Sequence, residues 1–411
     1  MLGIFNIFSL LYLLRGLQLG ATLWRERQEL LREPLTRHKK HLAEQASFFI
    51  AVPPGVFIHE LGHALAVWLF GGRVIEFGYR IFWGYVVPQG TFNPAQEWFV
   101  AVAGTLGNLV FGAGLWLLLR RHHANSLRYF ALRAFRFQLH FALIYYPVFT
   151  LFLPIGDWAT IYDFQATPVL SGATAVVHAA LLAWFWWADQ AGVFEMPGYD
   201  AAADQHTFTI LQQEAAANPH DVRLQLQVID ALRRGGATNK ARRHLNNFLK
   251  ENPDSAEAYL QLAVLQNQNH SQISRQVSRN AEKALHFGLS DPRSLAVAHQ
   301  ILGRFHLDRG QGEEAVNHLS QAIATAGGTR TGQHQNGDAL FCAQLYHWRS
   351  QAYRRLRQYD LAYQDVQQAI DQAHSAGDER AAAFYQGELE ILEKHAGRLF
   401  GATPTNPSER R

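Results

Sequence analysis

The sequence contains one cysteine, Cys342, among its 411 residues. One cysteine excludes an internal disulfide framework and a zinc site built from several thiolates. Any transition metal must therefore be bound by carboxylates and by some of the 20 histidines. The chain also lacks an excess of charge of one sign, because 37 basic and 34 acidic residues leave a net charge of +3. This balance argues against nucleic-acid binding driven by charge alone.

Apolar residues are concentrated in the first half of the chain. Up to about residue 192 the sequence is a series of runs rich in Phe, Trp and Leu, and from about residue 199 it is rich in Gln, Ala, Arg and Glu. This pattern predicts an all-α protein, in which a multipass transmembrane helical bundle precedes a soluble α-solenoid. We expect four regions: an N-terminal anchor and basic segment at 1–45, an intramembrane core at 46–192, the solenoid at 193–400, and a disordered tail at 401–411.

Four apolar runs reach the roughly 20 residues that a membrane-spanning helix needs. These runs are 46–70, 98–119, 137–157 and 170–190. A fifth run, 3–24, is interrupted by Arg15. It has no basic n-region and no small-residue cleavage site, so we expect a retained anchor that spans the membrane or lies in its interface.

Basic residues are clustered in two of the segments between runs. One cluster precedes residue 46 and consists of Arg25, Arg27, Arg32, Arg37, Lys39 and Lys40. The other lies between residues 119 and 137 and consists of Arg120, Arg121, Arg128, Arg133 and Arg136. The positive-inside rule places both segments in the cytoplasm. Alternation then returns the chain to the cytoplasm after the last run. We therefore expect a multipass protein of a bacterial inner membrane with a cytosolic polar half, where an unpaired cysteine suits the reducing environment.

The first spanning run contains the sequence HELGH, from His59 to His63. Ionisable residues at bilayer depth are costly and usually functional. Two histidines four residues apart lie on one face of a helix and can bind the same ion, and Glu60 beside that face can take a proton from a metal-bound water. The motif therefore predicts a water-activating zinc site within the membrane.

A catalytic zinc site needs a third protein ligand and one open position. Asp157, in the sequence FLPIGDWATIY, is the next acidic residue in an apolar run. We expect Pro147 and Pro154 to break that helix and Gly156 to allow close approach of the backbone.

Other residues could replace Asp157 as the third ligand. Asp163 lies nearer the following loop, and His140 lies in the same apolar run. We expect His178, which is alone in the last run, to pack or to form a hydrogen bond between helices.

Residues 79–94, YRIFWGYVVPQGTFNP, are rich in β-branched and aromatic residues around a Pro-Gln-Gly sequence. We predict a short hairpin with its turn at that sequence, dipping into the membrane surface. Non-helical backbone at that depth must be covered by protein or line a wet cavity.

HExxH in one transmembrane helix and an aspartate in a later one resemble the site-2-protease-type intramembrane zinc metalloproteases. AGTLGN, residues 103–108, is similar to the AGPxxN signature of that family, with Thr105 in place of proline. The hairpin segment falls where the family has a membrane-dipping β element. The resemblance covers about residues 46–165, and Asp157 precedes Trp158 where the family usually has glycine.

The resemblance implies a zinc metalloendopeptidase that cleaves a transmembrane segment of another protein. His59, His63 and Asp157 would bind Zn2+, and Glu60 would act as general base and then as general acid. Asn108 would contact the substrate backbone, with a hydrogen bond between helices as the alternative. The hairpin edge could hold an extended substrate strand by β-augmentation.

The polar half has a 34-residue period, because Pro219 and Pro253 are 34 residues apart. This is the length of a tetratricopeptide repeat. We predict four repeats, at residues 222–253, 256–292, 296–327 and 343–376. An earlier helix at 205–217 precedes them, a capping helix follows to residue 400, and residues 327–338 form an inserted loop. The concave face of such a solenoid would bind a peptide or protein partner. The scattered histidines of this half, His270, His299, His306 and His334, are expected to be solvated or packed.

Two classes of function fit these features. The first is a membrane-embedded protease whose repeats recruit a substrate or partner, and the second is a membrane-tethered scaffold with an inactive core. The intact Glu60 favours the protease, because an inactive core has no need of this residue. A transporter using the same ionisable residues is disfavoured, since the spans show no repeat symmetry.

Overall fold

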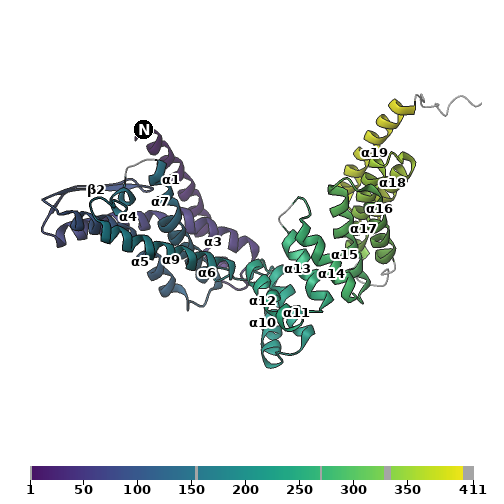
Figure 1. Cartoon of the computed structure of the whole chain (residues 1–411), viewed down its shortest axis with the longest axis horizontal. Helices are drawn as coiled ribbons and strands as arrows, with labels where there is room; N and C mark the ends of the chain where they lie inside the picture. Colours follow the sequence, from purple (N-terminus) through teal and green to yellow (C-terminus); the bar gives the residue numbers. More distant parts are fainter. Residues whose placement is uncertain (1, 153–155, 269–270, 328–334, 401–411) are drawn as a thin grey trace, which may run out of the picture. The chain divides into compact units, whose positions relative to one another are not determined.

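The computed structural model describes residues 2–152, 156–268, 271–327 and 335–400 (Figure 1). It divides into two compact units, Met1–Arg243 and His244–Arg411. The division falls within one helix, α12 (Thr238–Glu251), which belongs to the first predicted repeat. The domain boundaries proposed from composition, at residues 45 and 192, stay a prediction.

The first unit is mainly helical and contains one short β-hairpin. Its elements before α12 are α1 (Leu2–Arg25), α2 (Arg27–Leu30), α3 (Arg37–Phe49), α4 (Val52–Leu69), β1 (Arg73–Tyr79), β2 (Gly84–Gln89), α5 (Pro94–Leu119), α6 (Asn125–His140), the π-helix η1 (Phe141–Tyr145), α7 (Tyr146–Phe152), α8 (Asp157–Ile161), α9 (Pro168–Gln190), α10 (Ala202–Ala217) and α11 (Val222–Arg234). The predicted all-α class with a small β element is confirmed.

Three helical stretches in the described residues are long and apolar enough to cross a membrane. They are Arg37–Leu69, which comprises α3 and α4, Pro94–Leu119 (α5) and Pro168–Gln190 (α9). The predicted span at 137–157 is not one continuous helix, because the chain passes there from α6 through η1 into α7 and then α8. Three of the four predicted runs therefore match candidate spans.

Helices α4 and α5 approach each other at glycines. A Cβ atom on Gly62 would lie 2.4 Å from the Ala103 carbonyl oxygen, and one on Gly107 would lie 2.7 Å from the Ile58 carbonyl oxygen. Small residues allow this close backbone contact between membrane helices. The AGTLGN sequence therefore serves first as the contact surface of α5 against the helix that carries HELGH.

Pro147 follows an interruption of the regular α-helix, as the sequence predicted. It lies in α7, and the preceding residues adopt the wider π-helical turn η1. Proline has no N–H for the carbonyl one turn earlier, which is that of Leu143. His178 Nε2 lies 2.7 Å from this carbonyl oxygen and donates to it, so His178 forms the expected hydrogen bond between helices. Pro154 lies outside the described residues.

The predicted hairpin is present, but its turn was placed wrongly. β1 pairs antiparallel with β2, and the turn lies between them at residues 80–83, where Ile81 has φ of +68°. The Pro-Gln-Gly sequence is not the turn, since Pro88 lies within β2 opposite Val74. The hairpin therefore starts at Arg73, six residues before the predicted segment.

The second unit consists of paired helices, as predicted for tetratricopeptide repeats. After α12 come α13 (Ala256–Asn267), α14 (Arg275–Phe287), α15 (Pro292–Asp308), α16 (Gly312–Gly327), α17 (Gln335–Arg355), α18 (Tyr359–Ser375) and α19 (Glu379–Phe400). Small residues at the repeat positions are buried between the helices: Ala315, Ala322, Ser350, Ala362 and Ala369. The predicted loop at 327–338 is shorter at its end, because α17 begins at Gln335. Residues 328–334 and the predicted tail lie outside the described residues.

Histidines of the second unit are not all scattered. His299 and His306 of α15 lie beside His318 of α16, with 3.1 Å between the Nδ1 atoms of His299 and His318. The rings of His306 and His318 stack with centroids 5.4 Å apart. His299 and His306 are therefore packed, as expected, but the contact of both with His318 was not predicted. His270 and His334 lie outside the described residues.

Candidate metal centre

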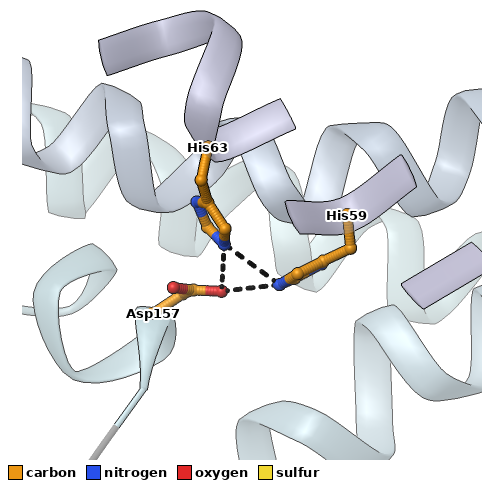
Figure 2. A group of neighbouring side chains, drawn as sticks. All are labelled: His59, His63 and Asp157. Carbon is orange, nitrogen blue, oxygen red and sulfur yellow. Dashed lines mark hydrogen bonds and ion pairs between the residues drawn. The ribbon is translucent and has the colours of Figure 1, made fainter. Parts of the chain in front are cut away.

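His59, His63 and Asp157 converge at one point in the first unit (Figure 2). His59 Nε2 lies 3.0 Å from Asp157 Oδ2, His63 Nε2 lies 3.2 Å from the same oxygen, and the two Nε2 atoms are 3.1 Å apart. Among the described residues, these three side chains form the group of His, Cys, Asp or Glu whose ligand atoms lie close enough together to hold one metal ion.

These three ligand atoms have the spacing that a tetrahedral zinc site requires. Bonds of about 2.0–2.1 Å at tetrahedral angles separate two ligand atoms by roughly 3.3 Å. The observed separations of 3.0–3.2 Å are slightly shorter, so the atoms would move apart by only a few tenths of an ångström. The donor set of two imidazoles and one carboxylate also suits zinc, and the site fits the ion.

Hydrogen bonds orient both imidazoles so that Nε2 faces the centre. His63 Nδ1 donates to the Val100 carbonyl oxygen at 2.7 Å. His59 Nδ1 lies 3.1 Å from Asn108 Nδ2. An imidazole that binds metal through Nε2 carries its proton on Nδ1, and rotation of the Asn108 amide would present its oxygen as the matching acceptor. Such outer contacts fix the tautomer and direction of metal ligands.

Asn108 is 3% exposed and contacts His59, as part of α5. It is not among the residues that line the cavity beside the three ligands. The structure therefore places Asn108 behind His59, and its predicted contact with substrate stays a prediction. The alternative considered from sequence, a hydrogen bond between helices, describes the observed contact.

Gly104 provides the space in which the imidazoles meet. A Cβ atom at this position would lie 2.3 Å from His63 Nε2 and 2.8 Å from His59 Nε2. Any side chain there would displace both rings. The glycine of the AGTLGN sequence therefore has a direct role at the centre, beyond helix packing.

Glu60 lies between the ligands and the hairpin. It is buried, and a Cβ atom on Gly84 of β2 would lie 2.8 Å from Glu60 Oε1. Glu60 lines a cavity of about 420 Å³ together with the three ligands. The cavity is also lined by mainly apolar residues of β2, of the segment after it and of α5: Tyr85, Val86, Pro88, Phe92 and Val100. The cavity has room for water next to a carboxylate.

The two alternative third ligands lie elsewhere. The Asp163 carboxylate accepts hydrogen bonds from the backbone N–H groups of Gln165 and Ala166, at 3.0 and 2.9 Å, and so closes a turn before α9. The His140 ring packs against Phe185 with centroids 6.3 Å apart. Neither belongs to the group of three side chains, which favours Asp157.

Sequence reasoning missed Tyr146, whose side chain also lines the cavity. Its hydroxyl lies 3.2 Å from Asp157 Oδ2. The only signal in the sequence was a tyrosine eleven residues before the aspartate, and the π-helix that turns it toward the site has no recognisable sequence pattern.

Comparison with known proteins was made at the levels of family and structure. Residues 54–195 match the family model described as Peptidase M50B-like, and residues 222–265 match a tetratricopeptide repeat model. No curated protein is significantly similar to the chain.

Solved structures with similarity to the chain have low identity. The MamA protein is 17% identical, with 45% of this chain and 97% of that chain covered and a TM-score of 0.29. The Cut9-Hcn1 hetero-tetramer of APC/C is 11% identical, with 87% and 66% covered and a TM-score of 0.36. A signal-transduction ATPase with a tetratricopeptide repeat sensor from Pyrococcus horikoshii is 13% identical, with 91% and 60% covered and a TM-score of 0.34.

The family matches agree in position with the two parts of the chain described above. The first match includes HELGH, the AGTLGN sequence and Asp157, and the second includes α11, α12 and nearly all of α13. Residues 54–195 are therefore a Peptidase M50B-like domain of the site-2-protease type, and tetratricopeptide repeats follow it in the same chain.

Proposed function

We propose that the protein is an intramembrane zinc metallopeptidase, which hydrolyses a peptide bond in or near a transmembrane segment of another protein. The observation that carries this proposal is the convergence of His59, His63 and Asp157 within 3.2 Å of one another, beside the buried Glu60. The Peptidase M50B-like family supports it, because peptidase function is the family's general character.

His59 Nε2, His63 Nε2 and Asp157 Oδ2 would hold the zinc ion. When bound, zinc lowers the pKa of a coordinated water to about 7 and polarises a carbonyl group. Glu60 takes a proton from the attacking water as the water oxygen forms a bond to the peptide carbonyl carbon. Glu60 then delivers that proton to the amine nitrogen as the C–N bond breaks.

The hairpin is the element best placed to hold the substrate. Gly84, Tyr85, Val86 and Pro88 of β2 line the cavity, and β1 pairs with β2 along one edge. An extended peptide could add to the other edge of β2 by β-augmentation, which would lay its backbone beside Glu60. Pro88 has no N–H to donate, so pairing would rest on the residues before it.

The repeats would recruit a substrate or partner on their concave face. The three apolar stretches and the family support a membrane protein. The basic segments before α4 and between α5 and η1 would lie on the cytoplasmic side. The repeats would lie on the same side when the stretch from α6 to α8 also crosses the membrane, which makes the number of crossings even.

The first test is the zinc content of the detergent-purified full chain. We expect close to one zinc per chain in the wild type, and loss of zinc in His59→Ala and Asp157→Ala. Asp163→Ala and His140→Ala should retain it, since their side chains lie outside the site. A wild type that stays metal-free after zinc is supplied would overturn the enzyme and favour the scaffold.

The second test separates metal binding from catalysis. We expect Glu60→Gln to bind zinc normally and to lower the hydrolysis rate by about 10²–10⁴-fold, because the general base is lost. New protein termini would be mapped by mass spectrometry in membranes of cells expressing the wild type or Glu60→Gln. Termini within transmembrane segments that appear equally with both proteins would contradict the proposed role of Glu60.

A further inference from the structure

Tyr146 is placed against both the first histidine and the carboxylate of the centre. Its ring lies edge-on to the His59 ring, with centroids 5.8 Å apart and planes at 64°. Its hydroxyl lies 3.2 Å from Asp157 Oδ2, the oxygen that also faces both Nε2 atoms. Tyr146 therefore contacts two of the three ligands from one side.

The hydroxyl of Tyr146 forms two hydrogen bonds with the same residue. It donates to Asp157 Oδ2 at 3.2 Å and accepts from the Asp157 backbone N–H at 3.2 Å. Asp157 is the first residue of α8, and its N-cap, Gly156, has no side chain to accept a hydrogen bond. First-turn N–H groups of a helix need such an acceptor. Tyr146 therefore replaces the missing cap and fixes the carboxylate at the same time.

The backbone on both sides is arranged to bring the phenol to this position. The π-helix η1 ends at Tyr145, whose side chain is 59% exposed, and the extra residue in that turn directs the next side chain inward. π-Helical turns are frequent at functional sites. Gly156 has φ of +103°, and a Cβ atom there would lie 2.8 Å from Tyr146 Oη.

We propose that Tyr146 is a positioning residue, which holds Asp157 in the orientation of the third metal ligand. This inference rests on the proposed zinc site. Without the hydroxyl, the carboxylate can rotate away from the two imidazoles and the first N–H of α8 loses its acceptor. Loss of an outer contact of this kind typically lowers metal affinity by about 10–100-fold.

The test compares Tyr146→Phe with Tyr145→Phe in the detergent-purified full chain. Both variants remove one phenol oxygen from neighbouring residues, but only Tyr146 faces the centre. Zinc affinity would be measured by competition with chelators of graded strength. We expect Tyr146→Phe to bind zinc about 10–100-fold more weakly, and Tyr145→Phe to match the wild type.

A double-mutant cycle with Asp157→Asn tests whether Tyr146 acts through the aspartate. If it does, removal of the hydroxyl from the Asp157→Asn variant should change zinc affinity little, because the contact is already altered. Additive effects of the two substitutions would show that Tyr146 acts independently of Asp157. If Tyr146→Phe instead caused a general loss of folding, it would weaken zinc binding in the Asp157→Asn variant as well. The cycle therefore distinguishes a folding defect from a positioning role.

The outcomes are separable from those of the proposed function. A wild type that binds zinc together with an unchanged Tyr146→Phe variant would overturn the inference and leave the zinc site intact. A wild type that binds no zinc would overturn both. Weaker binding in Tyr146→Phe alone, with non-additivity in the cycle, would support both.

Discussion

Gly104 is a residue at which one added carbon would conflict directly with His59 and His63 of the candidate metal centre. Its Cβ would lie within 2.8 Å of both Nε2 atoms. We expect Gly104→Ala to lower zinc affinity by more than the 10–100-fold typical of an outer contact, because both imidazoles must rotate. Chelator competition on the purified protein measures this effect.

Gly114 provides the matched control for this substitution. It lies on the same helix, α5, and a Cβ there would meet nothing within 4 Å. Gly114→Ala should bind zinc as the wild type does. Equal zinc affinity in Gly104→Ala and Gly114→Ala would contradict the placement of Gly104 against the imidazoles.

At this scale, the sequence predicts contacts within one helical turn better than those between elements. The spacing of His59 and His63 is enough to place both on one face of a helix, because the helical period is fixed. The hydrogen bond between His59 and Asn108 depends on how closely α4 and α5 approach. The position of Tyr146 depends on a π-helical turn, which no local pattern of residues specifies.

At the scale of elements, the histidines between α15 and α16 predict a dependence of stability on pH. Burial, with His299 and His306 beside it, lowers the pKa of His318 to about 4, while Glu282 opposes the shift. In the unfolded chain His318 is therefore protonated near pH 6.5, whereas in the folded chain it is protonated only near pH 4. This contribution to stability is present above pH 6.5 and is lost as the pH falls toward 4.

Hydrogen exchange of peptides from α15 and α16, in the full chain, measures this effect. His318 is half-buried, so solvent screening reduces the effect, and we expect a loss of about 1 kcal/mol between pH 7 and pH 5 after correction for intrinsic exchange. His318→Gln should remove most of this loss. His286→Gln, an exposed histidine on α14, should leave it unchanged. The same pH dependence in all three proteins would contradict the assignment.

The hairpin shows where sequence reasoning about elements fails. The Pro-Gln-Gly sequence has the residues of a turn, yet Pro88 pairs within β2 and the turn lies at residues 80–83. There Ile81 adopts φ of +68°, which β-branched residues rarely do. The strand composition predicts that a hairpin exists, but its register also involves packing of β2 against α4, which the local sequence does not reveal. The repeats were easier to predict, because each helix pair mainly contacts its neighbours.

At the scale of the whole molecule, Glu195 joins the membrane part of the first unit to the first repeat. Its carboxylate accepts hydrogen bonds from the backbone N–H groups of Asn239 and Lys240, at 2.9 and 3.0 Å, in the first turn of α12. The Lys240 ammonium donates back to the Glu195 carbonyl at 2.6 Å. We expect Glu195→Ala to destabilise the start of α12 by about 1 kcal/mol, the usual value of a helix cap.

Hydrogen exchange and limited proteolysis between residues 192 and 251 measure this loss. Glu257→Ala is the control, since Glu257 lies in the first turn of α13 but is exposed. It should change neither readout. Unchanged protection of α12 in Glu195→Ala would show that the carboxylate contributes nothing to this junction.

The cavity beside Glu60 would supply water, the second reactant of the proposed hydrolysis. Its volume of about 420 Å³ can hold on the order of a dozen water molecules at about 30 Å³ each. His59 and His63 lie near the middle of the 18-residue helix α4, and the point between them is about 13 Å from either end at 1.5 Å per residue. Solutes too large to enter would draw water out of this reservoir, so turnover should fall under osmotic stress while remaining nearly indifferent to added salt.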